Sequence, residues 1–209
     1  MSIIITGSSG GIGSSIQSSC IAAGFDIISL NRQIHDLKSD IYFNANNING
    51  LIYCAGINNP CEYNNLSIEN IKETMQINCF SFVSLCKSLG FNQGANILAI
   101  GSLYSTSTKI GRLAYTMSKH AMLGAIKTLA LEMAPNKIKV NMISPGFVLT
   151  PMTTKNNTQN RINELQEKIP LGITMPQDIA DICVFFLKQN KSITGQNIII
   201  DGGYSLLGI

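Results

Sequence analysis

The sequence predicts an α/β fold: a single domain, residues 1–209, with a doubly wound parallel sheet and helices on both faces. Short runs rich in Ile, Val and Leu alternate with longer segments of helical periodicity. Most of the apolar runs lack polar residues at alternate positions, which is typical of strands buried on both faces. Strands that alternate with helices indicate parallel pairing through right-handed crossovers, as in Rossmann-like folds. The length suits one domain of this kind.

The predicted elements follow one another without an internal repeat or a linker. The predicted strands are Ile3–Thr6, Asp26–Leu30, Leu51–Cys54, Asn96–Ile100, Lys139–Ile143 and Asn197–Ile200. The predicted helices are Gly11–Ala23, Ser67–Leu89, Leu113–Met133, Arg161–Lys168 and Asp178–Lys188. The last of these opens on an acidic residue and ends on a basic one, as the helix dipole favours.

Composition and charge exclude several classes of function. A net charge of +3 with scattered basic residues argues against a nucleic-acid partner. No apolar run approaches the roughly 20 residues of a membrane span. The first 13 residues lack the basic region of a signal peptide, so we expect a cytoplasmic protein whose six cysteines are reduced. No cluster of His, Cys or carboxylate residues has metal-ligand spacing, so we expect no metal.

A glycine-rich turn separates the first predicted strand from the first helix. Residues 6–13 read Thr-Gly-Ser-Ser-Gly-Gly-Ile-Gly. Glycines allow a phosphate to approach the backbone, and the helix N-terminus presents free N–H groups and partial positive charge. The pattern favours a dinucleotide site, whereas a tight turn without a ligand is the alternative.

The end of the second strand bears on which dinucleotide is bound. An acidic residue there would bind the ribose 2′-hydroxyl of NAD. Here the strand ends Ser29-Leu30-Asn31-Arg32, without a carboxylate. The guanidinium of Arg32 suits a 2′-phosphate, which favours NADP(H). An ordinary surface arginine, with NAD(H) bound through Asp36, is the alternative.

Tyr115 and Lys119 stand four residues apart and therefore share one face of a predicted helix. A nearby ammonium favours the phenolate and lowers the tyrosine pKa, which makes the phenol a usable general acid and base. The pair occurs by chance in many helices. The Tyr115 and Lys119 pair becomes informative because Ser102 lies just after a predicted strand and Asn78 lies in the preceding predicted helix.

Together these residues make the sequence resemble the short-chain dehydrogenase/reductase family over most of its length. The motifs that match, in chain order, are Thr6-Gly7 with Gly11-Ile12-Gly13, Tyr53-Cys54-Ala55-Gly56, the set Asn78, Ser102, Tyr115 and Lys119, Ser144-Pro145-Gly146 with Thr150, Asp178-Ile179-Ala180, Thr194-Gly195-Gln196, and Asp201-Gly202-Gly203. The nearest members in general character are 3-oxoacyl thioester reductases and the sugar or polyol dehydrogenases related to them.

The resemblance implies an NAD(P)-dependent oxidoreductase that interconverts a ketone and a secondary alcohol. Tyr115 would exchange the proton and Ser102 would bind the carbonyl oxygen. Lys119 would bind the nicotinamide ribose and lower the Tyr115 pKa, and Asn78 would anchor a water in a proton relay. Structural roles, a loop cap for Ser102 and a surface amide for Asn78, are the alternatives. The implied cofactor contacts are Gly7, Ser9, Gly11, Ile12, Gly13, Asn31, Arg32, Ala55, Gly56, Tyr115, Lys119, Pro145, Gly146, Val148 and Thr150.

The chain departs from the family pattern in two places. Only residues 31–50 separate the second strand from the strand at Leu51, where relatives fit a helix, a strand and another helix. Asp40–Phe43 is a candidate for a short strand there, and Asp36 or Asp40 for the acidic side chain over the adenine. Tyr53 and Cys54 replace two asparagines that tie the loop to the sheet in relatives, which puts local stability in doubt.

The resemblance also bears on substrate and partners. Residues 151–171 correspond to a mobile substrate lid, and they are polar and lack aromatic residues. This suits a polar metabolite, a sugar derivative or an acyl thioester. The helices Ser67–Leu89 and Leu113–Met133 would pack across two-fold axes in a homodimer or homotetramer. A non-catalytic nucleotide-binding assembly subunit is the alternative from another functional class.

Overall fold

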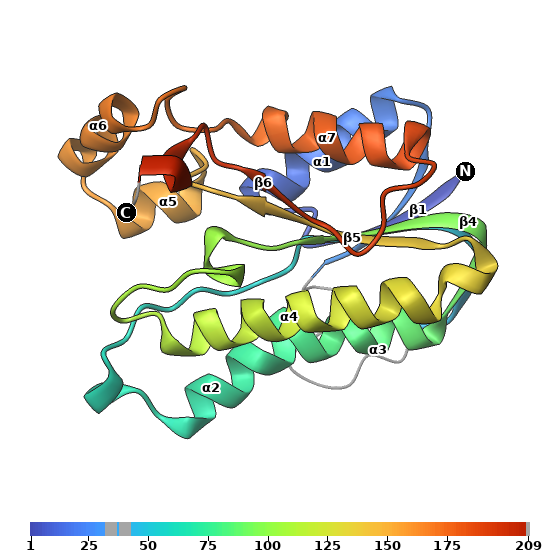
Figure 1. Ribbon diagram of the computed structural model, residues 1–209, viewed down its shortest axis with the longest axis horizontal. Helices are drawn as coiled ribbons and strands as arrows, with labels where there is room; N and C mark the ends of the chain where they lie inside the picture. Colours follow the sequence, from blue (N-terminus) through green and yellow to red (C-terminus); the bar gives the residue numbers. More distant parts are fainter. Residues whose placement is uncertain (32–36, 38–42, 208–209) are drawn as a thin grey trace.

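The computed structural model describes residues 1–31, 37 and 43–207, and its centre is one parallel sheet of six strands (Figure 1). The strand order is β2-β1-β3-β4-β5-β6, and every neighbouring pair is parallel. The strands are β1 (Ser2–Thr6), β2 (Asp26–Leu30), β3 (Ala45–Tyr53), β4 (Leu89–Ile100), β5 (Lys139–Pro145) and β6 (Asn197–Ile200). The predicted fold class is therefore confirmed.

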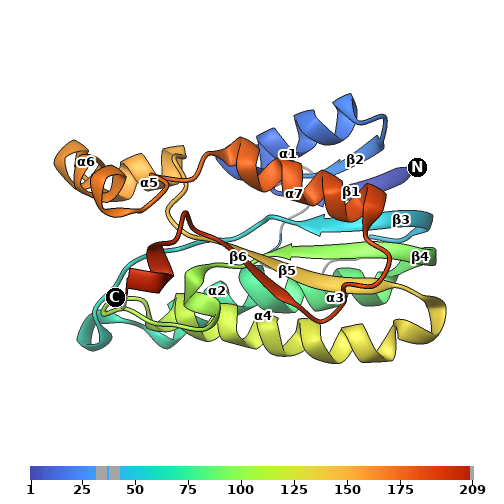
Figure 2. The same ribbon diagram turned by 45° about the horizontal axis from the view of Figure 1, so that its top comes forward.

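Helices cover both faces of the sheet, as Figure 2 shows. One face carries α1 (Gly11–Ala22) and α7 (Pro176–Gln189), and the other carries α2 (Ile68–Met75), α3 (Ser81–Ser88) and α4 (Leu113–Glu132). Two further helices, α5 (Pro151–Asn156) and α6 (Gln159–Lys168), lie beyond the carboxyl ends of the strands. None of the helices in the described parts of the chain is long and apolar enough to span a bilayer.

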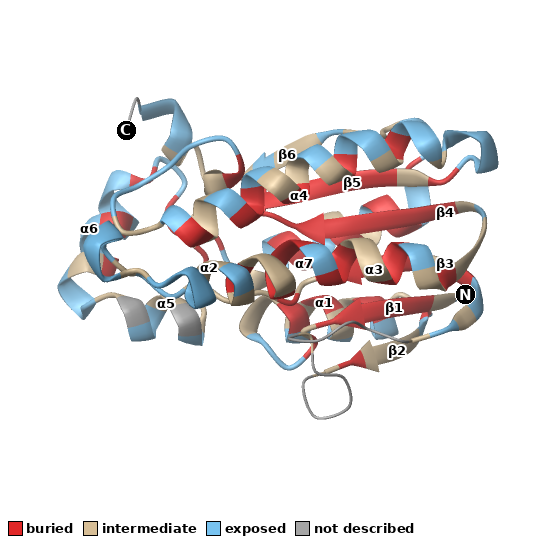
Figure 3. Cartoon of the chain, turned by 90° about the horizontal axis from the view of Figure 1, so that it is seen from below, coloured by how far each residue is buried: buried red, intermediate tan, exposed pale blue. Residues whose placement is uncertain are grey.

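The burial of β1 on both faces explains its unbroken apolar sequence. Ile3 and Ile5 point to the α1 and α7 side, where they pack with Ile16. Ile4 points to the opposite side, in the core formed with α3 and α4. All are essentially inaccessible to solvent, and Figure 3 shows the same burial along β4 and β5. A continuous apolar run follows from this two-sided burial.

Two strands start earlier than the sequence predicts. β3 begins at Ala45 instead of Leu51, and β4 begins at Leu89 instead of Asn96. The added segments pair with each other through an irregular register, with shifts between Ala45 and Ile48 and between Ile48 and Gly50. Their polar residues and this bulged pairing remove the apolar periodicity that would mark a strand. Residues 40–42 of the candidate strand Asp40–Phe43 lie outside the described part of the chain, and Phe43 is not in a strand.

The predicted helix Ser67–Leu89 is interrupted at its centre. A π-helical turn at Gln76–Phe80 separates α2 from α3. The buried hydroxyl of Tyr53, at the end of β3, donates a hydrogen bond to the Ile77 carbonyl inside this turn. The Tyr53 ring also packs edge-on against Phe82 in α3. Tyr53, which replaces an asparagine of the family pattern, therefore provides its own tie between sheet and helix.

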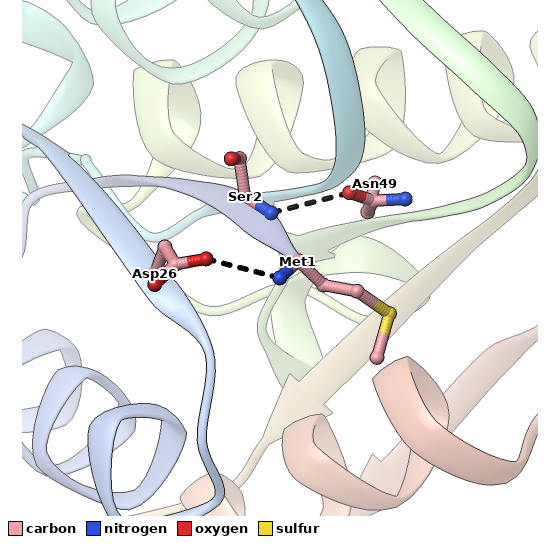
Figure 4. Close-up of polar contacts among 4 residues, drawn as sticks. All are labelled: Met1, Ser2, Asp26 and Asn49. Atoms are coloured by element: carbon pink, nitrogen blue, oxygen red, sulfur yellow. Dashed lines mark hydrogen bonds and ion pairs between the residues drawn. The ribbon is translucent and has the colours of Figure 1, made fainter.

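Polar contacts hold the start of β1 between its two neighbouring strands (Figure 4). The Met1 amino group lies 3.0 Å from the Asp26 carboxylate of β2. On the other side, the Ser2 amide donates to the Asn49 side chain of β3 at 3.1 Å. Both contacts lie at the amino end of β1, away from the end of the sheet where α5 and α6 lie.

The hydrogen bond from Tyr53 gives the first testable prediction. Tyr53→Phe keeps the ring packing but leaves the buried Ile77 carbonyl without its donor, which costs about 1–3 kcal/mol. The change is measured as a lower midpoint of urea unfolding. Tyr63→Phe is the control, because Tyr63 is 78% exposed and its variant should keep the wild-type midpoint. Equal unfolding midpoints for Tyr53→Phe and Tyr63→Phe would show that the hydrogen bond from Tyr53 contributes nothing to stability.

Candidate active site

A cleft of about 520 Å³ opens at the carboxyl ends of the strands. From β1 the chain adds β2 on one side of the sheet and β3 to β6 on the other. The point between β1 and β3 is therefore the topological switch point, where ligands bind in folds of this kind. The walls come from the glycine-rich turn after β1, the loops after β3, β4 and β5, and the first turns of α4 and α5. The cleft therefore joins segments that are far apart in the sequence.

The glycine-rich turn is packed so closely that side chains are excluded at three positions. A Cβ on Gly7 would lie 2.9 Å from the Ala55 backbone, and the φ of Gly7 is +66°. A Cβ on Gly13 would overlap the Gly7 carbonyl, and one on Gly11 would lie 2.9 Å from Thr150. Gly10 caps α1 without a side-chain hydrogen bond, and the first turn of α1 has no acidic residue. The turn therefore leaves the α1 N-terminus open to an anion such as a pyrophosphate.

The loop after β3 is fixed by Thr6. The Thr6 hydroxyl accepts hydrogen bonds from the amides of Cys54 and Ala55, at 3.1 and 3.2 Å. This side chain thus ties the loop to the sheet although the family's asparagines are replaced. Ala55 and Gly56 are thereby presented to the cleft.

The segment after β5 forms the opposite wall. Pro145, Gly146, Val148 and Thr150 all line the cleft. A Cβ on Gly146 would lie 2.6 Å from the Asp201 Cβ, so this wall is packed against the C-terminal segment. Asp201 in turn accepts from the amides of Gly203 and Ser205, and these bonds hold its pKa below its ordinary value.

The remaining predicted cofactor contacts fall at the end of β2. Leu30 lines the cleft, whereas Asn31 does not. Arg32, Asp36 and Asp40 lie outside the described residues. Leu37 was not singled out in the sequence, yet it lines the cleft at this side, and its carbonyl accepts a hydrogen bond from Ser81 of α3 at 2.9 Å.

Ser102, Tyr115 and Lys119 converge at the end of the cleft next to β4. The Lys119 ammonium lies 5.6 Å from the centre of the Tyr115 ring and donates to the Ile100 carbonyl at 2.7 Å. Ser102 hydrogen-bonds the Tyr115 side chain and also accepts from the Tyr104 amide at 3.3 Å. A hydroxyl, a phenol and an ammonium therefore face one space.

Asn78 is fully buried in the π-helical turn and does not line the cleft. Its side-chain oxygen accepts from the Ile57 amide at 2.8 Å, and its nitrogen donates to the Ile57 carbonyl at 3.0 Å and to Ser118 of α4 at 2.9 Å. A surface amide is excluded by this burial. Asn78 holds the loop after β3 against α4, beside Lys119.

Burial controls the ionisation of the central pair. It raises the pKa of Tyr115 to about 12, although the hydrogen bond from Ser102 and the charge of Arg112 act in the opposite direction. It also lowers the pKa of Lys119 to about 8. In this structure Ser102 and Arg112 are the groups that act to lower the Tyr115 pKa, so the lowering by Lys119 that the family resemblance implies stays a prediction. At neutral pH the phenol is protonated and Lys119 is mostly charged.

Other cleft residues carry no motif and were missed in the sequence. Tyr104 packs edge-on against Tyr115, with ring centres 6.1 Å apart. Arg112 donates from Nη1 to the Asn58 side-chain oxygen at 2.7 Å. No spacing rule in the sequence marks them, and only the fold brings them together at the cleft. No cluster of three potential metal ligands occurs within the part of the chain that the structure describes.

Comparisons with known proteins agree with this architecture. The family model described as enoyl-(acyl carrier protein) reductase matches residues 10–205. Carbonyl reductase family member 4 of Xenopus tropicalis is 32% identical over 184 residues, which cover 86% of this chain and 76% of that protein. The 3-oxoacyl-(acyl-carrier-protein) reductase FabG of Rickettsia bellii is 30% identical, with 96% and 95% covered. The crystal structure of a short-chain dehydrogenase family protein from Francisella tularensis superposes with a TM-score of 0.86 at 29% identity and covers 98% of both chains.

The packing of the glycine-rich turn gives a second prediction. In Gly13→Ala the new Cβ overlaps the Gly7 carbonyl, so the turn must open and dinucleotide affinity must fall. Affinity is measured by fluorescence titration with NADPH and NADH. Circular dichroism checks that the variant is folded.

Gly124→Ala is the matched control, because a Cβ on Gly124 meets nothing within 4 Å. In the interior of α4 this change should add about 0.5–1 kcal/mol of stability and leave dinucleotide affinity unchanged. Wild-type affinity in folded Gly13→Ala would show that the turn does not form the binding site.

Proposed function

The chain belongs to the short-chain dehydrogenase/reductase family and is thus an oxidoreductase of carbonyl and alcohol groups, and we propose that it transfers a hydride between NADP(H) and a ketone or secondary alcohol. The observation that supports this most is that the proposed catalytic residues and the proposed dinucleotide site lie in one cleft. Tyr115, Ser102 and Lys119 line the same cleft as the glycine-rich turn at the α1 N-terminus. The glycine-rich turn suits the pyrophosphate of a dinucleotide, and the proton donors at the other end suit a carbonyl compound bound beside it.

A dinucleotide held by the glycine-rich turn and Lys119 would supply the hydride for the carbonyl carbon. Tyr115 donates its phenolic proton to the carbonyl oxygen, and Ser102 donates a hydrogen bond to the same oxygen as negative charge develops there. Lys119 provides positive charge beside the phenol and returns the tyrosine to its protonated form. Asn78 acts as a positioning residue, since it holds Ile57 and Ser118 around Lys119.

The names of two relatives favour reduction as the direction and a carbonyl compound as the substrate. The proteins from Xenopus tropicalis and Rickettsia bellii are named as a carbonyl reductase and a 3-oxoacyl-(acyl-carrier-protein) reductase. A lid for the substrate, residues 151–171, fits this proposal at its α5 end, because Thr153 and Asn157 line the cleft. A cytoplasmic site of action is part of this proposal.

A homodimer or homotetramer is also part of this proposal. Large apolar side chains stay exposed on the α2, α3 and α4 side of the sheet: Ile68, Phe80, Leu113, Met117 and Leu131. Such a surface is typical of subunit contacts.

Replacement of the proposed proton donor gives a third prediction. Tyr115→Phe removes the donor but keeps the ring, so kcat for ketone reduction should fall by about 10²–10⁴ while dinucleotide affinity persists. Steady-state kinetics and fluorescence titration measure the two effects. Tyr63→Phe, on the surface, is the control. Undiminished turnover in folded Tyr115→Phe would refute the mechanism.

The pH profile of the wild-type enzyme offers a second readout of the same mechanism. Lys119 carries its charge below its pKa of about 8 and loses it above. Reduction should therefore be fastest below about pH 8 and decline above it.

The choice between the two dinucleotides gives a fourth prediction. If Arg32 binds the 2′-phosphate, the wild type should bind NADPH more tightly than NADH, and Arg32→Ala should weaken NADPH binding with little change for NADH. Parallel fluorescence titrations measure both affinities. A wild-type preference for NADH would rule out NADP(H) as the preferred cofactor but would leave the proposed hydride transfer standing.

A further inference from the structure

Arg112 is the residue just before α4, three positions before Tyr115, and it lines the cleft. Its charge lies close enough to the two tyrosines of this end of the cleft to act on both. The Arg112 charge acts to lower the pKa of both Tyr104 and Tyr115. Its side chain reaches across to Asn58 in the loop after β3. The guanidinium is therefore placed at the Tyr115 end of the cleft, where a carbonyl substrate would lie.

The charge of Arg112 is not neutralised in this position. Its side-chain contact is to the neutral amide of Asn58, through Nη1. No Asp or Glu occurs among the described residues that line the cleft. The other cation there, Lys119, is 4% exposed and donates to the Ile100 carbonyl. Arg112 is thus a half-buried cation that lines the cleft, and its Nε and Nη2 make no hydrogen bond to another residue within the described part of the chain.

A guanidinium in such a place suits an oxyanion. It stays charged at any physiological pH and presents parallel N–H donors that match a carboxylate or a phosphate. The hydrogen bond to Asn58 fixes one edge of the fork and leaves another edge for a ligand. In a partly desolvated cleft a charge-assisted bond of this kind contributes more than it does in water.

We propose that Arg112 determines substrate specificity by selecting ketones, or the corresponding alcohols, that carry a carboxylate or a phosphate group close to the reacting carbon. The proposal rests on the proposed oxidoreductase function and adds the chemical class of its substrate. A guanidinium held only to tie the loop to α4 would be the purely structural use of this residue. The two uses differ in one respect: only the first discriminates between charged and neutral substrates.

The experiment compares ketones in charged and neutral pairs. Acetoacetate and methyl acetoacetate test a carboxylate, and dihydroxyacetone phosphate and dihydroxyacetone test a phosphate. We expect kcat/KM to be higher for the charged member of at least one pair. Arg112→Gln keeps hydrogen-bonding ability toward Asn58 but removes the charge, so it should reduce that preference about 10- to 100-fold.

Two further variants separate specificity from folding. Arg112→Lys keeps the positive charge and should restore part of the preference for the charged ketone. Lys109→Gln removes an exposed charge from the same loop, outside the cleft lining, and should retain the wild-type preference. If Arg112 had only a structural role, Arg112→Lys would not restore kcat/KM for the charged ketones alone.

The outcomes distinguish the two proposals. If the charged-to-neutral ratio is the same in wild type and Arg112→Gln, or if the wild type prefers the neutral member of both pairs, the inference about Arg112 is overturned while ketone reduction stands. If the wild type reduces none of the four ketones and binds neither NADPH nor NADH, the proposed function fails and the inference fails with it.

Discussion

The arrangement of the site depends on the clamped π-helical turn between α2 and α3. Two side chains hold this turn from different directions: Tyr53 donates to its Ile77 carbonyl, and Asn78, within the turn, binds both the Ile57 backbone and Ser118. A buried amide that satisfies its donors and acceptor in this way is costly to displace. Through it, the end of β3, the loop that follows and α4 share one fixed geometry. Gly56 lies beside this network, since a Cβ on Gly56 would be 3.3 Å from the Asn78 oxygen and 3.8 Å from the Lys119 nitrogen.

The electrostatic state of the site follows from that burial. Desolvation disfavours the charged form of every group, so the pKa of Tyr115 rises while that of Lys119 falls. In the geometry seen here the two groups are not a tyrosinate and an ammonium. They are a phenol and an ammonium that donates to the Ile100 carbonyl. A protonated phenol suits the proton donor of the proposed carbonyl reduction, whereas oxidation would need the phenol to lose its proton first.

Local patterns in the sequence were sufficient for the fold class and the order of the strands along the chain, and they singled out Ser102, Tyr115 and Lys119, which the structure brings to one cleft. The buried strands can be recognised in the sequence because burial on both faces requires apolar residues throughout, as in Ile3–Ile5. The polar starts of β3 and β4 gave no such signal, since their pairing is irregular and Asn47 takes a positive φ. The π-helical turn was equally hidden, because apolar spacing is kept on both sides of it. Arg112 could not be found by motif at all, since only the fold brings it to Asn58.

The connection between β2 and β3 is short, and two of its described residues contact the rest of the domain. β2 forms the edge of the described sheet, and β3 pairs on the far side of β1. The Leu37 carbonyl is bound by Ser81, and Leu37 and Phe43 both pack against the core beneath α3 and α4. Because Leu37 also lines the cleft, this connection contributes an apolar side chain to the cleft. The glycine-rich turn and the Tyr115 end of the cleft are held separately, by β1, β4 and α4.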